Sequence, residues 1–115
     1  MSRGDEICCA PQNIVELWNV STRPATARGG FGLTTAETDR RVRLIERVFT
    51  ILEETPAVYL EWRRLVVNYS VVGVQVHDAR IVAVMNLHAV THVLTLNSPD
   101  FSRYAGIMCV APDQV

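Results

Sequence analysis

Four polar residues lie at the ends of the apolar segments of this chain, where they could do chemistry together. They are Glu16, Asp78, Asn97 and Asp100. Clustered carboxylates repel one another and stay ionised only when a cation compensates their charge. Hard oxygen ligands of this kind suit Mg²⁺ or Mn²⁺. Such a metal can position a water and neutralise the charge of a phosphodiester, so one interpretation of these residues is metal-dependent hydrolysis.

Each of the four residues also has an ordinary structural explanation. Asp78 could be a helix N-cap, which stabilises a helix by about 1 kcal/mol. Glu16 could be an acid in the first turn of a helix, where its charge suits the helix dipole. Asn97 and Asp100 could be turn residues around Pro99. From spacing alone, these structural explanations are the stronger ones.

The first half of the chain predicts short strands that alternate with helices. Ile7–Ala10 is an apolar run typical of a strand, and a helix follows over Ile14–Ser21 with Asn13 as its cap. Thr34 precedes Glu37 by three residues, which is the capping-box pattern and predicts the start of the next helix. A short edge strand at 51–52 ends this half.

The second half predicts two helices followed by two apolar strands. The helix over Thr55–Tyr69 has Pro56 at its first position and a buried stripe of Tyr59, Trp62, Leu65 and Val66. Trp62 is interpreted as a core residue, with a ligand platform as the alternative. The helix over Asp78–His88 is apolar nearly all round, which predicts packing on more than one side.

The two expected strands, Val93–Leu96 and Ile107–Val110, are continuous apolar runs, as in strands covered on both faces. Strands and helices in this order predict an α/β layer fold with a mostly parallel sheet. In such a sheet, ligands bind beyond the carboxyl ends of the strands, so all four polar residues can lie at one edge.

The composition of the chain limits the kinds of partner that it can bind and the compartment in which we expect it. A length of 115 residues predicts one domain. The net charge of −1 gives no bulk attraction to nucleic acid or acidic membranes, so any nucleic-acid binding must use a local patch. The polar side of the second helix carries Arg40, Arg41, Arg43 and Arg47, either as a solvated face or as a phosphate-contacting or partner-contacting one. Three Cys without a signal peptide predict a cytoplasmic protein. The sequence contains no apolar run of about 18 residues, so no membrane helix is expected.

Two segments resemble a known family. The string VHDARIVAVMNLHAVTHVLTLNSPDFSRY resembles the C-terminal half of PIN domains, in particular the toxin ribonucleases of the VapBC toxin–antitoxin type. CAPQNIVELWNVSTRP is similar to the segment that supplies the second acidic residue of the family. The resemblance covers roughly residues 6–112 and implies a PIN-like (Rossmann-like) three-layer α/β fold.

The resemblance also implies a site and an activity. Glu16 and Asp78 would be catalytic acids, and with Asn97 and Asp100 they would hold one or two Mg²⁺ or Mn²⁺ ions. The implied reaction is hydrolysis of an RNA phosphodiester by a metal-activated water. Arg23 and Arg28 would contact RNA phosphates. The implied partners are the RNA substrate, a cognate antitoxin and a second copy of the chain in a homodimer, with no membrane.

One feature of the family has no match in this sequence. PIN domains begin with a strand that ends in Asp-Thr-Asn or a close variant, and its Asp is the first metal ligand. We therefore expect residues 1–115 to be a single PIN-like domain that is incomplete at its N-terminus, with impaired ribonuclease activity. The alternative is a catalytically inactive PIN-like remnant that acts as a binding or dimerisation module.

Overall fold

The computed structural model describes residues 6–95 and 97–114, which belong to two compact units. The N-terminal unit ends at Glu53 and the C-terminal unit begins at Glu54. Each unit combines helices with a two-stranded parallel sheet, so the predicted α/β class and the parallel pairing are confirmed. Among the described residues the strands form two separate pairs.

The N-terminal unit joins a strand pair to two helices. Strand β1 (Cys8–Cys9) pairs with β2 (Thr50–Ile51), and the backbone N–H of Leu52 donates to the Cys9 carbonyl at 2.8 Å. Helix α1 (Pro11–Thr22) and helix α2 (Thr35–Val48) lie between these strands in the sequence. The expected edge strand at 51–52 is thus present one residue earlier.

Local sequence explains where the two helices begin. The Thr34 hydroxyl accepts from the Glu37 N–H at 3.1 Å, so the predicted capping box of α2 is confirmed. Helix α1 starts three residues before the predicted Ile14, because Pro11 occupies its first position without needing an N–H partner. Asn13 is therefore inside α1, and its side chain accepts from the Ala10 N–H at 2.9 Å.

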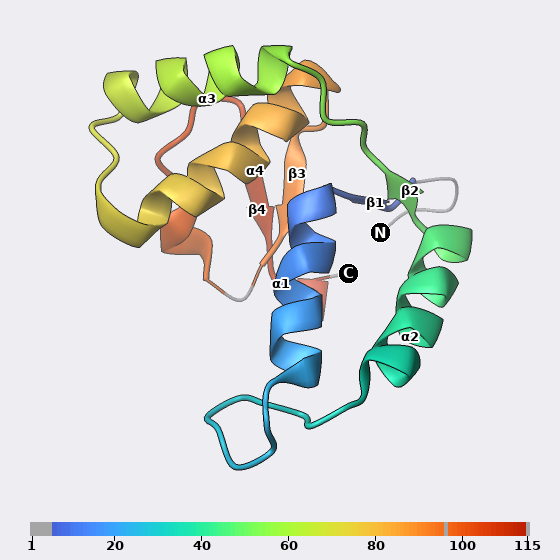
Figure 1. The fold of residues 1–115 in the computed structure, drawn as a ribbon. Coiled ribbons are helices and arrows are strands. Elements are labelled where there is room, and N and C mark those ends of the chain that lie inside the picture. The colour runs from blue at the N-terminus through green and yellow to red at the C-terminus, as the bar shows by residue number, and fades with distance from the viewer. Residues whose placement is uncertain (1–5, 96, 115) are drawn as a thin grey trace. The chain divides into compact units, whose positions relative to one another are not determined.

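The C-terminal unit is built around helix α4 (Val76–Leu87), which packs along helix α3 (Ala57–Asn68) (Figure 1). Six residues of α4 are buried, which confirms the prediction of packing on more than one side: Ala79, Ile81, Val82, Ala83, Val84 and Met85. A 3₁₀ turn, Gly73–Gln75, leads directly into α4. Gly73 has φ of 62°, a left-handed conformation that glycine adopts without strain.

Two strands and two 3₁₀ turns complete this unit. Strand β3 (His92–Leu94) pairs in parallel with β4 (Met108–Val110). The prediction that both strands are covered on both faces is wrong, because Leu94 is 60% exposed and Met108 is 58% exposed. Leu96, the last residue of the expected first strand, lies outside the described residues. The 3₁₀ turns are Ser98–Asp100 and Pro112–Gln114.

Candidate active site

Asp78 is the third residue of α4 and is half-buried. The N-cap interpretation of Asp78 is wrong, because the 3₁₀ turn brings the helix start forward and Gln75 occupies the N-cap position. A carboxylate in the first turn is still favoured by the positive end of the helix dipole. Because the following residues of α4 are buried, the backbone that carries Asp78 is held by the core of its unit.

The side chain of Tyr104 lies within electrostatic reach of Asp78. Its ring is 3% exposed and packs edge-on against Tyr69 at 4.9 Å between ring centroids. Burial raises the pKa of Tyr104, and the negative charge of Asp78 adds to that rise, against an opposing effect of Arg103. Tyr104, next to this acidic residue, is therefore harder to ionise than an ordinary tyrosine.

Asn97 and Asp100 are brought together, as the sequence suggested. The Asn97 side-chain amide donates to Asp100 Oδ2 at 2.7 Å, and the Asp100 N–H donates to the Asn97 carbonyl at 3.0 Å. Phe101, which follows them, is 7% exposed and anchors the turn in the core. The pair forms a hydrogen-bonded polar turn after β3, which agrees with the turn interpretation and leaves the metal interpretation untested.

Glu16 belongs to the N-terminal unit and is exposed on α1. It is the sixth residue of the helix, so it is not the first-turn acid that the sequence suggested, and the dipole effect has faded there. Its Oε1 accepts from the Gln12 side-chain amide at 3.2 Å. Its proposed partnership with Asp78 remains a prediction.

The two candidate RNA contacts, Arg23 and Arg28, share the loop that follows α1. The guanidinium of Arg23 donates to the Arg28 carbonyl at 2.9 Å, which folds the loop back on itself. Gly30 makes that fold possible, because a Cβ there would lie 2.3 Å from the Pro24 carbonyl oxygen. Arg28 is exposed and Arg23 is half-buried, so their role as phosphate contacts stays a prediction.

The donor types of the candidate site fit a hard divalent cation, since carboxylate and amide oxygens are the ligands that Mg²⁺ and Mn²⁺ prefer. The arrangement of these donors fits a metal site less well than their chemical types do. Within residues 6–95 and 97–114, no three His, Cys, Asp or Glu side chains gather as a metal site. Asp78, Asn97 and Asp100 belong to the C-terminal unit, whereas Glu16 belongs to the other.

The prediction that Tyr59 lies in the buried stripe of α3 is wrong. Tyr59 is 59% exposed, because α3 buries the face that carries Val58 and Leu65 instead. The exposed ring borders a pocket with Trp62, Arg80 and Glu54. Only the aromatic pair could have been noticed from the sequence, because Glu54 and Arg80 are far apart along the chain.

These elements place the chain among α/β proteins with parallel strand pairs and acidic residues next to helix and turn starts. A family model for the PIN domain matches residues 1–107, so the chain belongs to the PIN domain family and the resemblance is confirmed. PIN domains are generally nucleases that act on RNA, and they typically use divalent metal ions. Searches of curated proteins and of solved structures found no match. None of the described helices has the length and apolar character needed to cross a bilayer.

Proposed function

We propose that this chain is a Mg²⁺- or Mn²⁺-dependent endoribonuclease of the PIN type, related to VapC-like toxins. The observation that carries the proposal is the match of residues 1–107 to the PIN domain, with Asp78 held in the first turn of a buried helix. The proposed substrate is RNA, and the reaction is hydrolysis of a phosphodiester bond. We propose the cytoplasm as the compartment and a single PIN domain as the organisation.

In this proposal Asp78 and Glu16 are the catalytic acids, and Asn97 and Asp100 add oxygen ligands for the metal. The bound ion would neutralise phosphate charge and lower the pKa of a water. The Asn97–Asp100 hydrogen bond would favour one orientation of the Asp100 carboxylate before a ligand arrives, which would lower the entropic cost of binding. Arg23 and Arg28 would contact phosphates, for which the guanidinium fork is well shaped.

The second candidate is a PIN-like remnant that binds or dimerises without cutting RNA. It is favoured by the lack of a three-ligand group among the described side chains. An exposed apolar face of α3 also supports a contact surface, with Leu60 at 64% and Val67 at 70% exposure. A cognate antitoxin and a second copy of the chain are the proposed partners.

Cleavage of a structured RNA by the purified chain tests the proposal. We expect cleavage with Mg²⁺ and none with EDTA. Asp78→Asn should lower the rate at least about 100-fold, since it removes a ligand charge. Asp113→Asn is the matched control, because Asp113 is an exposed residue of the last 3₁₀ turn. Equal cleavage by wild type and Asp78→Asn would show that the proposed site is wrong, and RNA binding without any cleavage would favour the remnant.

A further inference from the structure

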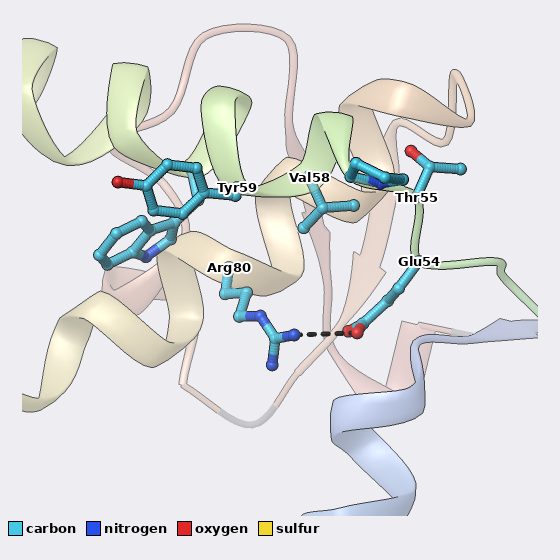
Figure 2. A pocket seen from close by; sticks show the side chains of 7 residues that line it. Glu54, Thr55, Val58, Tyr59 and Arg80 are labelled. Atoms are coloured by element: carbon cyan, nitrogen blue, oxygen red, sulfur yellow. Dashed lines mark hydrogen bonds and ion pairs between the residues drawn. The ribbon is translucent and has the colours of Figure 1, made fainter.

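One pocket in the C-terminal unit lies between the start of α3 and Arg80 of α4. It has a volume of about 550 Å³, within the range of small-molecule sites. Its lining includes Glu54, Pro56, Val58, Tyr59, Trp62 and Arg80. Figure 2 shows Tyr59 on α3 at one side of the pocket and Arg80 reaching from α4 toward Glu54.

One side of the pocket is aromatic. The Tyr59 and Trp62 rings are 6.2 Å apart between centroids and tilted by 34°, so they form an angled surface and not a closed stack. Trp62 is fixed in place, because its indole N–H donates to the Val76 carbonyl at 2.8 Å. Tyr59 is 59% exposed. A fixed indole beside an exposed phenol ring suits a planar ligand that stacks.

The other side of the pocket is an ion pair whose two side chains can make further hydrogen bonds. Arg80 Nη2 donates to Glu54 Oε2 at 2.9 Å, and the Arg80 side chain is 47% exposed. A guanidinium carries five N–H donors, so Arg80 can donate further hydrogen bonds besides the one to Glu54. Glu54 Oε1 is shielded from solvent and has no hydrogen-bond partner among the described residues. Such an oxygen is costly unless a donor reaches it.

We propose that this pocket binds a guanine base of single-stranded RNA. The base would stack on Tyr59 and Trp62, since base–aromatic stacking is sequence-tolerant and needs only a planar ring. Specificity would come from the ion pair. Arg80 would donate to guanine O6 and N7, the pairing that Arg makes most often with a base. Guanine N1–H or N2–H would donate to Glu54, whose carboxylate turns toward the pocket about a soft terminal torsion.

Guanine fits this pattern better than the other bases. It alone presents two adjacent acceptors to an arginine and N–H donors on its neighbouring edge. Adenine offers an amino donor beside N7, which would place a donor against the guanidinium. The site is distinct from the candidate acids: Asp78 and Arg80 are two positions apart on α4, so they leave the helix on different faces.

The test is calorimetric titration of the full chain with GMP, AMP, CMP and UMP in EDTA, so that no metal chemistry is needed. We expect GMP to bind at least about tenfold more tightly than AMP. Tyr59→Ala should weaken GMP binding at least about fivefold, whereas Tyr59→Phe keeps the ring and should stay within about twofold. Because Tyr59 is exposed, neither variant is expected to unfold the chain.

Glu54→Gln tests the specificity step. The amide offers a donor where guanine also offers donors, so the preference for GMP over AMP should fall to about threefold or less. Glu46→Gln is the matched control, because Glu46 is exposed on α2 and lies outside the pocket. Equal affinity for the four mononucleotides, or an unchanged preference in Glu54→Gln, would overturn the inference. Binding of N-acetyl-tryptophanamide with no binding of GMP would assign the pocket to a protein partner and also overturn it.

The inference uses the proposed RNA substrate, but the two can fail separately. If the chain cleaves RNA and Glu54→Gln leaves the base preference at the cleavage site unchanged, the guanine pocket is wrong and the ribonuclease stands. If no RNA is cleaved but GMP binds in a Glu54-dependent way, the proposed activity is wrong and the pocket stands.

Discussion

Helices α2 and α4 hold their places by different means. Only Thr38 and Val42 of α2 are buried, whereas α4 buries six residues, four of them completely. Helix α2 instead has a complete capping box, while the N-cap position of α4 makes no side-chain cap. One helix therefore depends on local hydrogen bonds and the other on packing. The candidate catalytic acid, Asp78, is on the packed helix, whose backbone we expect to open less often than that of α2.

The largest expected difference between the two helices is in the core. Ile81→Ala in α4 removes a side chain that is 8% exposed and leaves a cavity. We expect the free energy of unfolding to fall by about 2–5 kcal/mol. Leu44→Ala in α2 removes a side chain that is 57% exposed, and we expect a change within about 0.5 kcal/mol. Urea denaturation followed by circular dichroism measures both, and equal losses would contradict the comparison.

The helix cap is the second point of difference. Thr34→Ala removes the hydroxyl that accepts from the Glu37 N–H. The expected loss is about 1 kcal/mol in the free energy of unfolding. Thr34→Ser keeps the acceptor oxygen and should stay close to wild type. Hydrogen exchange at the first turn of α2 should rise in Thr34→Ala alone, and no change there would show that the cap is not needed.

A polar link gives the smallest expected effect. Glu61 on α3 accepts from Arg64 at 2.7 Å and from Asn86 on α4 at 2.8 Å. The hydrogen bond from Arg64 is the main reason that the pKa of Glu61 lies below its usual range, and the bond from Asn86 acts in the same direction. Because the folded state then binds fewer protons, this stabilisation is present above the ordinary Glu pKa of about 4.3 and is lost as the pH falls through the lowered value.

We therefore expect Glu61→Gln to lower the free energy of unfolding by about 0.5–1 kcal/mol at pH 7 and by less at pH 3. Asp39→Asn, which breaks an exposed pair with Arg43 within α2, should change it by less than about 0.5 kcal/mol at pH 7. Denaturation of each variant at both pH values provides the measurement. A Glu61→Gln difference that grows on acidification would contradict the expected sign.

Short-range patterns in the sequence predicted most of the fold. The Thr34 capping box depends on residues three apart, and the burial of α4 follows from its apolar composition, so both were predictable. The Asn97–Asp100 turn was also predictable, because Pro99 lies between its members. The start of α4 was placed two residues late because Asp is a favoured N-cap residue, whereas the chain enters α4 directly from the turn Gly73–Gln75. Tyr59 was assigned to the core because its stripe differs by one position from the face that α3 buries.

Contacts between residues far apart in the chain could not be predicted from the sequence. The Glu54–Arg80 ion pair joins a loop to a helix far along the chain, and no local pattern marks it. The association of Glu16 with Asp78 rests on the expected sheet edge and on the family resemblance, and it stays a prediction for the same reason.

The two strand pairs also differ in the length of chain that each must close. Cys8 pairs with Thr50 across two helices, whereas His92 pairs with Met108 across a short turn region. Folding slows as contacts become more distant in sequence, because the entropy of closing a loop is lost before the contact forms. We therefore expect β3 and β4 to associate early, together with the α3–α4 hairpin, and β1 to join β2 late. In refolding of the full-length chain, the β3–β4 pair would then form before the β1–β2 pair.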